Sequence, residues 1–151
     1  MKFEHLVQIN DPVNPLGEIL SREQLWQGLW HRVENPVAFL PGLESCQILE
    51  RQESSLLREL DFGVAQIRDR VSFAVRQWLR FDVEAGATHA GGALTIRLEE
   101  PQPDALFLRF TYETTLREDG DHAEYVKSAY RESDLETVRL IRLLLAKGSL
   151  Q

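Results

Sequence analysis

The residues with the clearest chemical potential are polar side chains that interrupt apolar faces. Asp69 stands between Ile67 and Val71 in a strand-like alternation. A carboxylate is costly to bury there unless it is paired. Arg58 is the candidate partner, because a hairpin that turns near residues 62–64 places it opposite or diagonal to Asp69. The pair would be either a structural ion pair or an anchor for a carboxylate or an enol, and Asp69 could instead sit at a bulge that faces water.

The inward direction of Arg58 depends on which face of its strand is buried. Arg58 points inward if its apolar neighbours at alternate positions, Leu56, Leu60 and Phe62, do so. The rival face of the same segment consists of Leu57, Glu59 and Asp61. The sequence leaves these two alternatives open.

Three further side chains could orient a bound molecule or move a proton. His5 lies among apolar residues of the first strand-like stretch, where it is either a core residue or an acid–base group. Tyr112 and Tyr130 each carry a hydroxyl on an apolar ring, and we expect them to face each other from a strand and from the last helix. Such groups are suited to holding a ligand oxygen, although core packing is the alternative.

The remaining candidates for a cavity lining are mostly apolar. Trp26 and Trp30 belong to the apolar stripe of the first helical segment, where they either pack in the core or line a cavity. The others occupy inward positions of predicted strands and of the last helix: Phe81, Ile96, Leu108 and Thr137. The histidines lack the spacing of metal ligands, and Gly91-Gly92 precedes a strand rather than a helix. We therefore expect neither a metal nor a cofactor.

Local sequence patterns predict the helices and strands that position these residues. Alternation over residues 2–10 predicts a strand. Ser21 and Gln24 form a capping box that begins a helix, and Asn35-Pro36 ends it. Residues 37–40 are a short apolar turn or a second small helix. Six strand segments then follow, at about 43–52, 55–62, 64–75, 77–84, 92–100 and 105–116.

Short connectors between these strands predict antiparallel neighbours, and each later strand has one apolar face. On segment 64–75 that face runs through Val71 and Phe73 to Val75, whereas Arg68 and Trp78 are expected on the solvent side. Residues 121–147 carry apolar side chains at a spacing of three and four, which predicts a long amphipathic helix across the dry face. The predicted fold class is α+β: a seven-stranded curved antiparallel sheet wrapped around a long C-terminal helix, with a short helix pair after the first strand.

Composition narrows the class of protein. The 151 residues are expected to form one domain, 1–151, with a real core. A net charge of −7 argues against nucleic acid as a partner. The charged N-terminal stretch is no signal peptide, no apolar run is long enough for membrane insertion, and the single cysteine, Cys46, favours a reducing compartment. A cytoplasmic location is the expectation.

Several stretches also carry a family resemblance. They are KFEHLVQINDPVNP (2–15), LSREQLWQGL (20–29), PGLESCQILE (41–50), LLRELDFGVAQIRDRV (56–71), LFLRFTYE (106–113) and AEYVKSAYRESDLETVRL (123–140). Together with the order of elements, they resemble the helix-grip (SRPBCC) fold of START lipid-transfer domains, birch-pollen-type allergens and polyketide cyclases. More closely, the chain is similar to AtaL-like proteins. The resemblance implies a cavity between sheet and C-terminal helix, but it brings no catalytic motif.

Three classes of function follow from these observations. The first is the binding or carriage of a small, largely hydrophobic or aromatic ligand in the internal cavity. The second is a cofactor-free enzyme of the polyketide cyclase, dehydratase or isomerase type, in which Asp69 or His5 moves a proton while a tyrosine or Arg58 polarises an oxygen. The third is a protein-interaction module with a vestigial cavity. A monomer or a homodimer fits each class.

Overall fold

The computed structural model describes residues 1–13, 17–86, 91–115 and 121–148. The predicted order of elements is confirmed, and the strand ends differ from the predicted ones by two residues at most. The elements are β1 (Lys2–Gln8), α1 (Arg22–Glu34), the 3-10 helix η1 (Pro36–Ala38), β2 (Ser45–Arg51), β3 (Ser55–Asp61), β4 (Gln66–Ala74), β5 (Trp78–Val83), β6 (Gly92–Glu99), β7 (Phe107–Thr114) and α2 (Asp121–Ala146).

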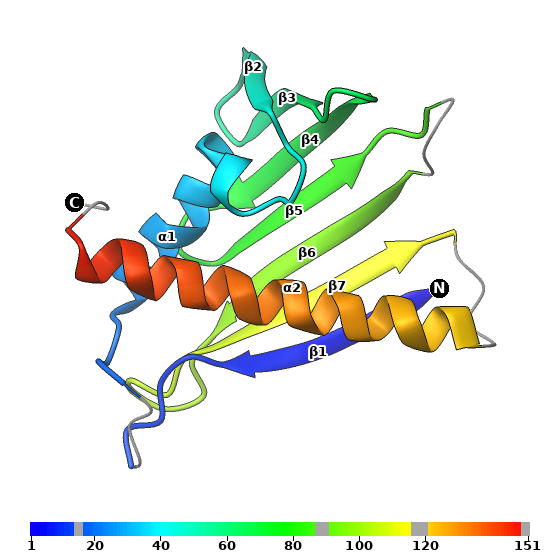
Figure 1. The fold of residues 1–151 in the computed structure, drawn as a ribbon. Helices are drawn as coiled ribbons and strands as arrows, with labels where there is room; N and C mark the ends of the chain where they lie inside the picture. Colours follow the sequence, from blue (N-terminus) through cyan, green and yellow to red (C-terminus); the bar gives the residue numbers. More distant parts are fainter. Residues whose placement is uncertain (14–16, 87–90, 116–120, 149–151) are drawn as a thin grey trace.

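The seven strands form one antiparallel sheet in the order β1-β7-β6-β5-β4-β3-β2. Strands β2 to β7 are a meander, and β1 joins it by pairing with β7, the strand farthest from it in the sequence. Figure 1 shows the curved sheet with α2 lying across its inner face and α1 beside the C-terminal half of α2. The predicted α+β helix-grip architecture is therefore confirmed.

Helix α1 begins at the capping box that the sequence predicts. The Ser21 hydroxyl accepts a hydrogen bond from the Gln24 backbone N–H at 3.0 Å, and the Gln24 side chain accepts one from the Ser21 N–H at 2.9 Å. These bonds satisfy backbone donors that the first turn of a helix leaves without partners. The helix ends at Asn35, directly before Pro36, as expected from the restriction that a proline places on its neighbour.

The two helices touch at Gly28 and Ile141. Ile141 is fully buried, and a Cβ atom added at Gly28 would overlap its side chain. The absence of a side chain at Gly28 thus allows α1 and α2 to approach closely. This contact fixes α1 against α2.

Strand β4 is shorter than its apolar pattern suggests, and the prediction that Val75 faces inward is wrong. The strand ends at Ala74, and Val75 is 48% exposed in the turn that follows. Arg76 adopts a positive φ of 62° there, which breaks the alternation of strand faces.

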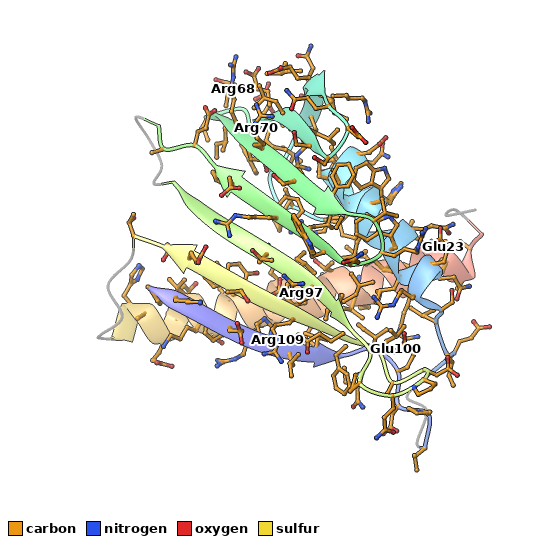
Figure 2. All side chains as sticks on the ribbon, turned by 180° about the vertical axis from the view of Figure 1, so that it is seen from behind. Glu23, Arg68, Arg70, Arg97, Glu100 and Arg109 are labelled. Atoms are coloured by element: carbon orange, nitrogen blue, oxygen red, sulfur yellow. The ribbon has the colours of Figure 1, made fainter. Side chains whose placement is uncertain are left out.

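The outer face of the sheet is polar, as predicted. The Arg68 side chain is half exposed and lies 3.1 Å from the Glu59 carboxylate, and Trp78 is half-buried on the same face. Figure 2 shows this face, with Arg68, Arg70, Arg97 and Arg109 projecting away from the helices.

Candidate functional site

The first polar group of the interior is an ion pair between β3 and β4. Arg58 and Asp69 are direct partners in the strand register, and both side chains are buried. Arg58 Nε lies 2.8 Å from Asp69 Oδ1, and Nη2 lies 2.6 Å from Oδ2, a bidentate geometry. The predicted juxtaposition is confirmed, and the buried face of β3 is the one that carries Leu56, Arg58 and Leu60.

Arg58 also fixes the end of helix α1. Its Nη1 donates a hydrogen bond to the Val33 carbonyl at 2.7 Å, in the last turn of the helix. A cation is favourable at this end because the terminal carbonyls carry partial negative charge. Each of the three guanidinium nitrogens of Arg58 therefore donates one hydrogen bond, two of them to Asp69 and one to the Val33 carbonyl.

The second polar group joins β1, β7 and α2 around Asp134, which is 1% exposed. His5 Nε2 lies 2.6 Å from Asp134 Oδ2, and the Tyr112 hydroxyl donates to Oδ1 at 2.7 Å. Burial raises the pKa of Asp134, and the bonds from His5 and Tyr112 offset part of that rise. Burial also raises the pKa of Tyr112, and the neighbouring Asp134 carboxylate adds to this increase.

Asp134 is a site residue that sequence reasoning missed. It falls on the apolar stripe of α2 between Tyr130 and Thr137, so it interrupts that stripe as Asp69 interrupts the face of β4. A carboxylate within an apolar stripe is the signal that identifies it.

An aromatic stack borders the Asp134 group. The rings of Tyr112 and Tyr130 lie parallel, with an interplanar angle of 3° and centroids 3.8 Å apart. The expectation that these two residues face each other from sheet and helix is confirmed. Burial raises the pKa of Tyr130, so its hydroxyl stays protonated at neutral pH and can donate a hydrogen bond.

Arg32 on α1 is the second missed residue. It is buried, its guanidinium carbon lies 5.1 Å from the centroid of the Phe81 ring, and its Nε has no hydrogen-bond partner among the described residues. Burial lowers the pKa of Arg32. The signal was present in the sequence, because Arg32 follows Leu25 and Leu29 at the spacing of the buried stripe.

A pocket of about 240 Å³ lies between the sheet and α2 at the Tyr112–Tyr130 stack. The residues that line it are Val83, Gly91, Gly92, Ala93, Leu94, Tyr112, Thr114 and Tyr130. The strand register connects this lining to the other polar groups, because Val83 is the partner of Asp69 and Leu94 is the partner of both Phe81 and Tyr112. Phe81 and the two arginines, Arg32 and Arg58, are buried next to these positions and do not line the pocket.

The other predicted site residues lie outside this pocket. Ile96 and Leu108 are fully buried in the core, and Trp26 is buried within α1. Trp30 is half-buried, packs edge-on against Phe73 and donates to Glu34 at 2.9 Å. Thr137 donates to the Ser133 carbonyl within α2. Ligand contact by these residues stays a prediction.

Within residues 1–13, 17–86, 91–115 and 121–148, no three His, Cys, Asp or Glu side chains come together in a way that could hold a metal ion. Over the same residues, neither helix has the length and apolar character that crossing a bilayer requires.

A curved antiparallel sheet that holds a long C-terminal helix defines the helix-grip class of proteins. The family model described as acetylaranotin biosynthesis cluster protein L (AtaL) matches residues 7–148, so the chain belongs to the AtaL family. No curated protein matches the sequence.

Solved structures share this fold at low sequence identity. The Zhui aromatase/cyclase from Streptomyces sp. R1128 is 14% identical, with 96% of this chain and 95% of that chain covered and a TM-score of 0.65. The di-domain ARO/CYC StfQ from the steffimycin biosynthetic pathway is 10% identical over 98% of this chain and 51% of StfQ, with a TM-score of 0.71. Ara h 8.0201 is 10% identical over 93% of this chain and 97% of that one, with a TM-score of 0.62. These similarities establish the fold.

Proposed function

We propose that the protein binds a small, largely hydrophobic aromatic molecule between the sheet and α2. The pocket at the Tyr112–Tyr130 stack is the observation that carries this proposal, because it places aromatic faces and a buried polar group around one space. The ligand body would lie on Leu94 and Val83, with an oxygen directed toward Tyr130 or Tyr112.

The size of the pocket bounds the size of the ligand. Its volume of about 240 Å³ exceeds the ~150 Å³ of an engineered cavity that holds benzene, and it falls below the range of about 300–1,000 Å³ that is usual for drug-sized ligands. A molecule of one or two fused rings fits this range. Carriage of such a molecule is the simplest function that follows.

A fluorescence titration with the neutral two-ring dye prodan tests this proposal. Leu94→Trp should fill the pocket and weaken binding by about tenfold or more, since a bulky ring leaves little room for the dye. Thr95→Trp is the matched control, because it adds the same ring on the opposite face of β6. Absence of saturable binding by the wild type, or equal binding by both variants, would place the ligand elsewhere.

Acid–base catalysis on such a ligand is a second candidate, favoured by the hydrogen-bonded group His5–Asp134–Tyr112 beside the pocket. Its chemistry would be a cofactor-free cyclisation or dehydration; among the structures with the same fold, Zhui is an aromatase/cyclase and StfQ is a di-domain ARO/CYC. His5 is a better proton carrier here than Asp69, because both oxygens of Asp69 are bonded to Arg58.

The catalytic candidate has its own test. A short poly-β-ketone that closes to an aromatic ring with loss of water can be followed by its ultraviolet absorbance. We expect acceleration by the wild type and none by His5→Gln, provided that both proteins bind prodan equally. Equal rates with and without protein would leave binding alone as the function.

The remaining expectations belong to the same proposal. We propose that residues 1–151 act as one domain in the cytoplasm, as a monomer or a homodimer, without a cofactor. A nucleic-acid partner is not proposed, because the net charge is −7. Size-exclusion chromatography with light scattering distinguishes the two oligomeric states.

A further inference from the structure

We propose that Arg32 is the recognition point for an anionic oxygen of the ligand, so that the ligand class is an aromatic carboxylate or enolate rather than a neutral aromatic. This inference rests on the proposed binding function. In this proposal Arg32 binds one end of the ligand, and the pocket at Tyr112 and Tyr130 binds the other end.

The first observation is that Arg32 is a buried cation without a counter-ion. Its residue exposure is 8%, its Nε has no hydrogen-bond partner in the described part of the chain, and it forms no ion pair there. Buried charges in proteins are normally paired, because taking a charge out of water is costly. The Phe81 ring supplies a cation–π contact but no hydrogen-bond acceptor.

The second observation is that the nearby carboxylates are already engaged. Both oxygens of Asp69 accept bonds from Arg58, and both oxygens of Asp134 lie within hydrogen-bond distance of His5 or Tyr112. Neither acid bonds to Arg32. The Arg58 guanidinium lies 5.3 Å from the centroid of the same Phe81 ring, but its charge is balanced by Asp69, so Arg32 is the unpaired cation at this ring.

The third observation is the position of Arg32 relative to the pocket: Arg32 is buried and does not line the pocket, but one strand position, Phe81, separates it from the lining residue Leu94. Phe81 lies under Arg32 and pairs in register with Leu94, which lines the pocket and pairs with Tyr112. A planar ligand whose body lies at Leu94 can direct one substituent to the tyrosines and, by displacing the buried Phe81 ring, the other toward Arg32. The planar guanidinium fork matches the geometry of a carboxylate, and hydrogen bonds between charged partners are the stronger kind.

Two probes of nearly identical shape test this inference: 2-naphthoate and 2-naphthamide, each competing with prodan. The wild type should bind naphthoate about tenfold or more tightly than naphthamide, as expected for charge-assisted hydrogen bonds. Arg32→Met should remove this preference and retain naphthamide and prodan binding, and Arg32→Lys should retain part of it. Arg97→Met on the outer face of β6 is the control and should behave as the wild type does.

The outcomes separate this inference from the binding function on which it rests. Prodan binding without any preference for naphthoate, or a preference that survives in Arg32→Met, overturns the role of Arg32 alone. Failure of the wild type to bind prodan overturns the binding function, and this inference with it.

Thermal melting distinguishes a ligand anchor from a structural arginine. Without ligand, Arg32→Met should be at least as stable as the wild type, because the substitution removes an unpaired buried charge. Naphthoate should raise the Tm of the wild type more than naphthamide does, whereas the two probes should raise the Tm of the variant equally. A marked fall in the Tm of the ligand-free variant would make Arg32 part of the folding core and would overturn the proposal.

Discussion

At the scale of residues, the interior polar groups differ in how completely they are bonded. Arg58 and Asp69 satisfy each other and the end of α1, and the Asp134 carboxylate is bonded from two sides. Arg32 has no such partner. A buried polar group that already has its partners has little capacity left for a ligand, whereas Arg32 keeps an unused donor.

Breaking the Arg58–Asp69 pair should be far more costly than replacing it. Asp69→Leu alone leaves a buried guanidinium unpaired and should lower the free energy of unfolding by about 3–5 kcal/mol. The double variant Arg58→Met/Asp69→Leu should recover most of that loss, apart from the bond to the Val33 carbonyl. Urea unfolding of the two single variants and of the double variant measures the coupling. Additive losses would show that the two side chains act independently.

The Asp134 carboxyl predicts a pH dependence of stability. Burial raises the pKa of Asp134 above its ordinary value of 3.8, so the fold favours the neutral carboxyl. The resulting stabilisation is complete below the unfolded-state value and is lost as pH rises through the folded-state pKa. Melting curves from pH 3.5 to 8 should therefore show that the wild-type protein loses stability relative to the Asp134→Asn variant as pH rises.

The comparison is best repeated in a His5→Gln background, which removes the imidazole that is bonded to Asp134. If the Tm of the protein with Asp134 rose relative to that of Asp134→Asn as pH increases, the raised pKa of Asp134 would be contradicted.

At the scale of elements, the fold depends on how the helices pack on the sheet and on each other. Helix α2 packs its apolar stripe on the inner face of the sheet, and α1 reaches α2 through Gly28 and Ile141. Charged side chains on the outer face are paired across strands, for example Arg68 with Glu59. Substitutions on the two faces should therefore differ strongly in their effect on stability.

Ile141→Ala should lower the free energy of unfolding by about 2–5 kcal/mol, because the side chain is fully buried. Gly28→Ala should also destabilise, since its methyl group would overlap Ile141. In the double variant, the added methyl group enters the space that Ile141 vacates, so the losses should be less than additive. A thermal melt of Ile141→Ala that matches the wild type would contradict the packing of α2.

Charge reversal at Arg68 tests the opposite face. Arg68→Glu should change the free energy of unfolding by only about 0.5 kcal/mol, because the side chain is half exposed and its ion pair is a surface pair. Equilibrium unfolding in urea gives the value. A collapse of the fold would mean that this face is buried.

At the scale of the whole molecule, the sheet and α2 enclose a site between segments that are distant in the sequence. Residues of β1, β7 and α2 supply the Asp134 group, and β5, β6 and α1 supply the surface that leads to Arg32. The site therefore exists only in the complete fold, and its ligand should be retained or lost with the fold as a unit.

Native mass spectrometry of the purified protein should detect a co-purified ligand of the mass of a one- or two-ring aromatic acid, released on denaturation. The pocket volume of about 240 Å³ sets this size, and Arg32 sets the acidic group. A much larger adduct, such as a lipid, would contradict the proposed ligand size.

The sequence by itself determined the elements and most of their faces. Alternation, the Ser21–Gln24 capping box and the turn residues are local signals, and the structure confirms the elements that they predict. A charged residue on an apolar face also suggested the Asp69–Arg58 pair, because a short hairpin leaves few alternatives for its register, but only the structure decided which face of β3 is buried. Val75 was assigned wrongly because a turn with positive φ ended the alternation early.

Only the tertiary structure decided which faces meet. The bond between His5 and Asp134 spans 129 positions, and it exists because β1 pairs with β7 beneath α2. Arg32 faces the Phe81 ring because α1 is held by Arg58 and by its contact with Ile141. A periodic pattern reports the side of an element that is buried. The partner on that side depends on how the sheet curves and closes around the helix, which no local signal contains.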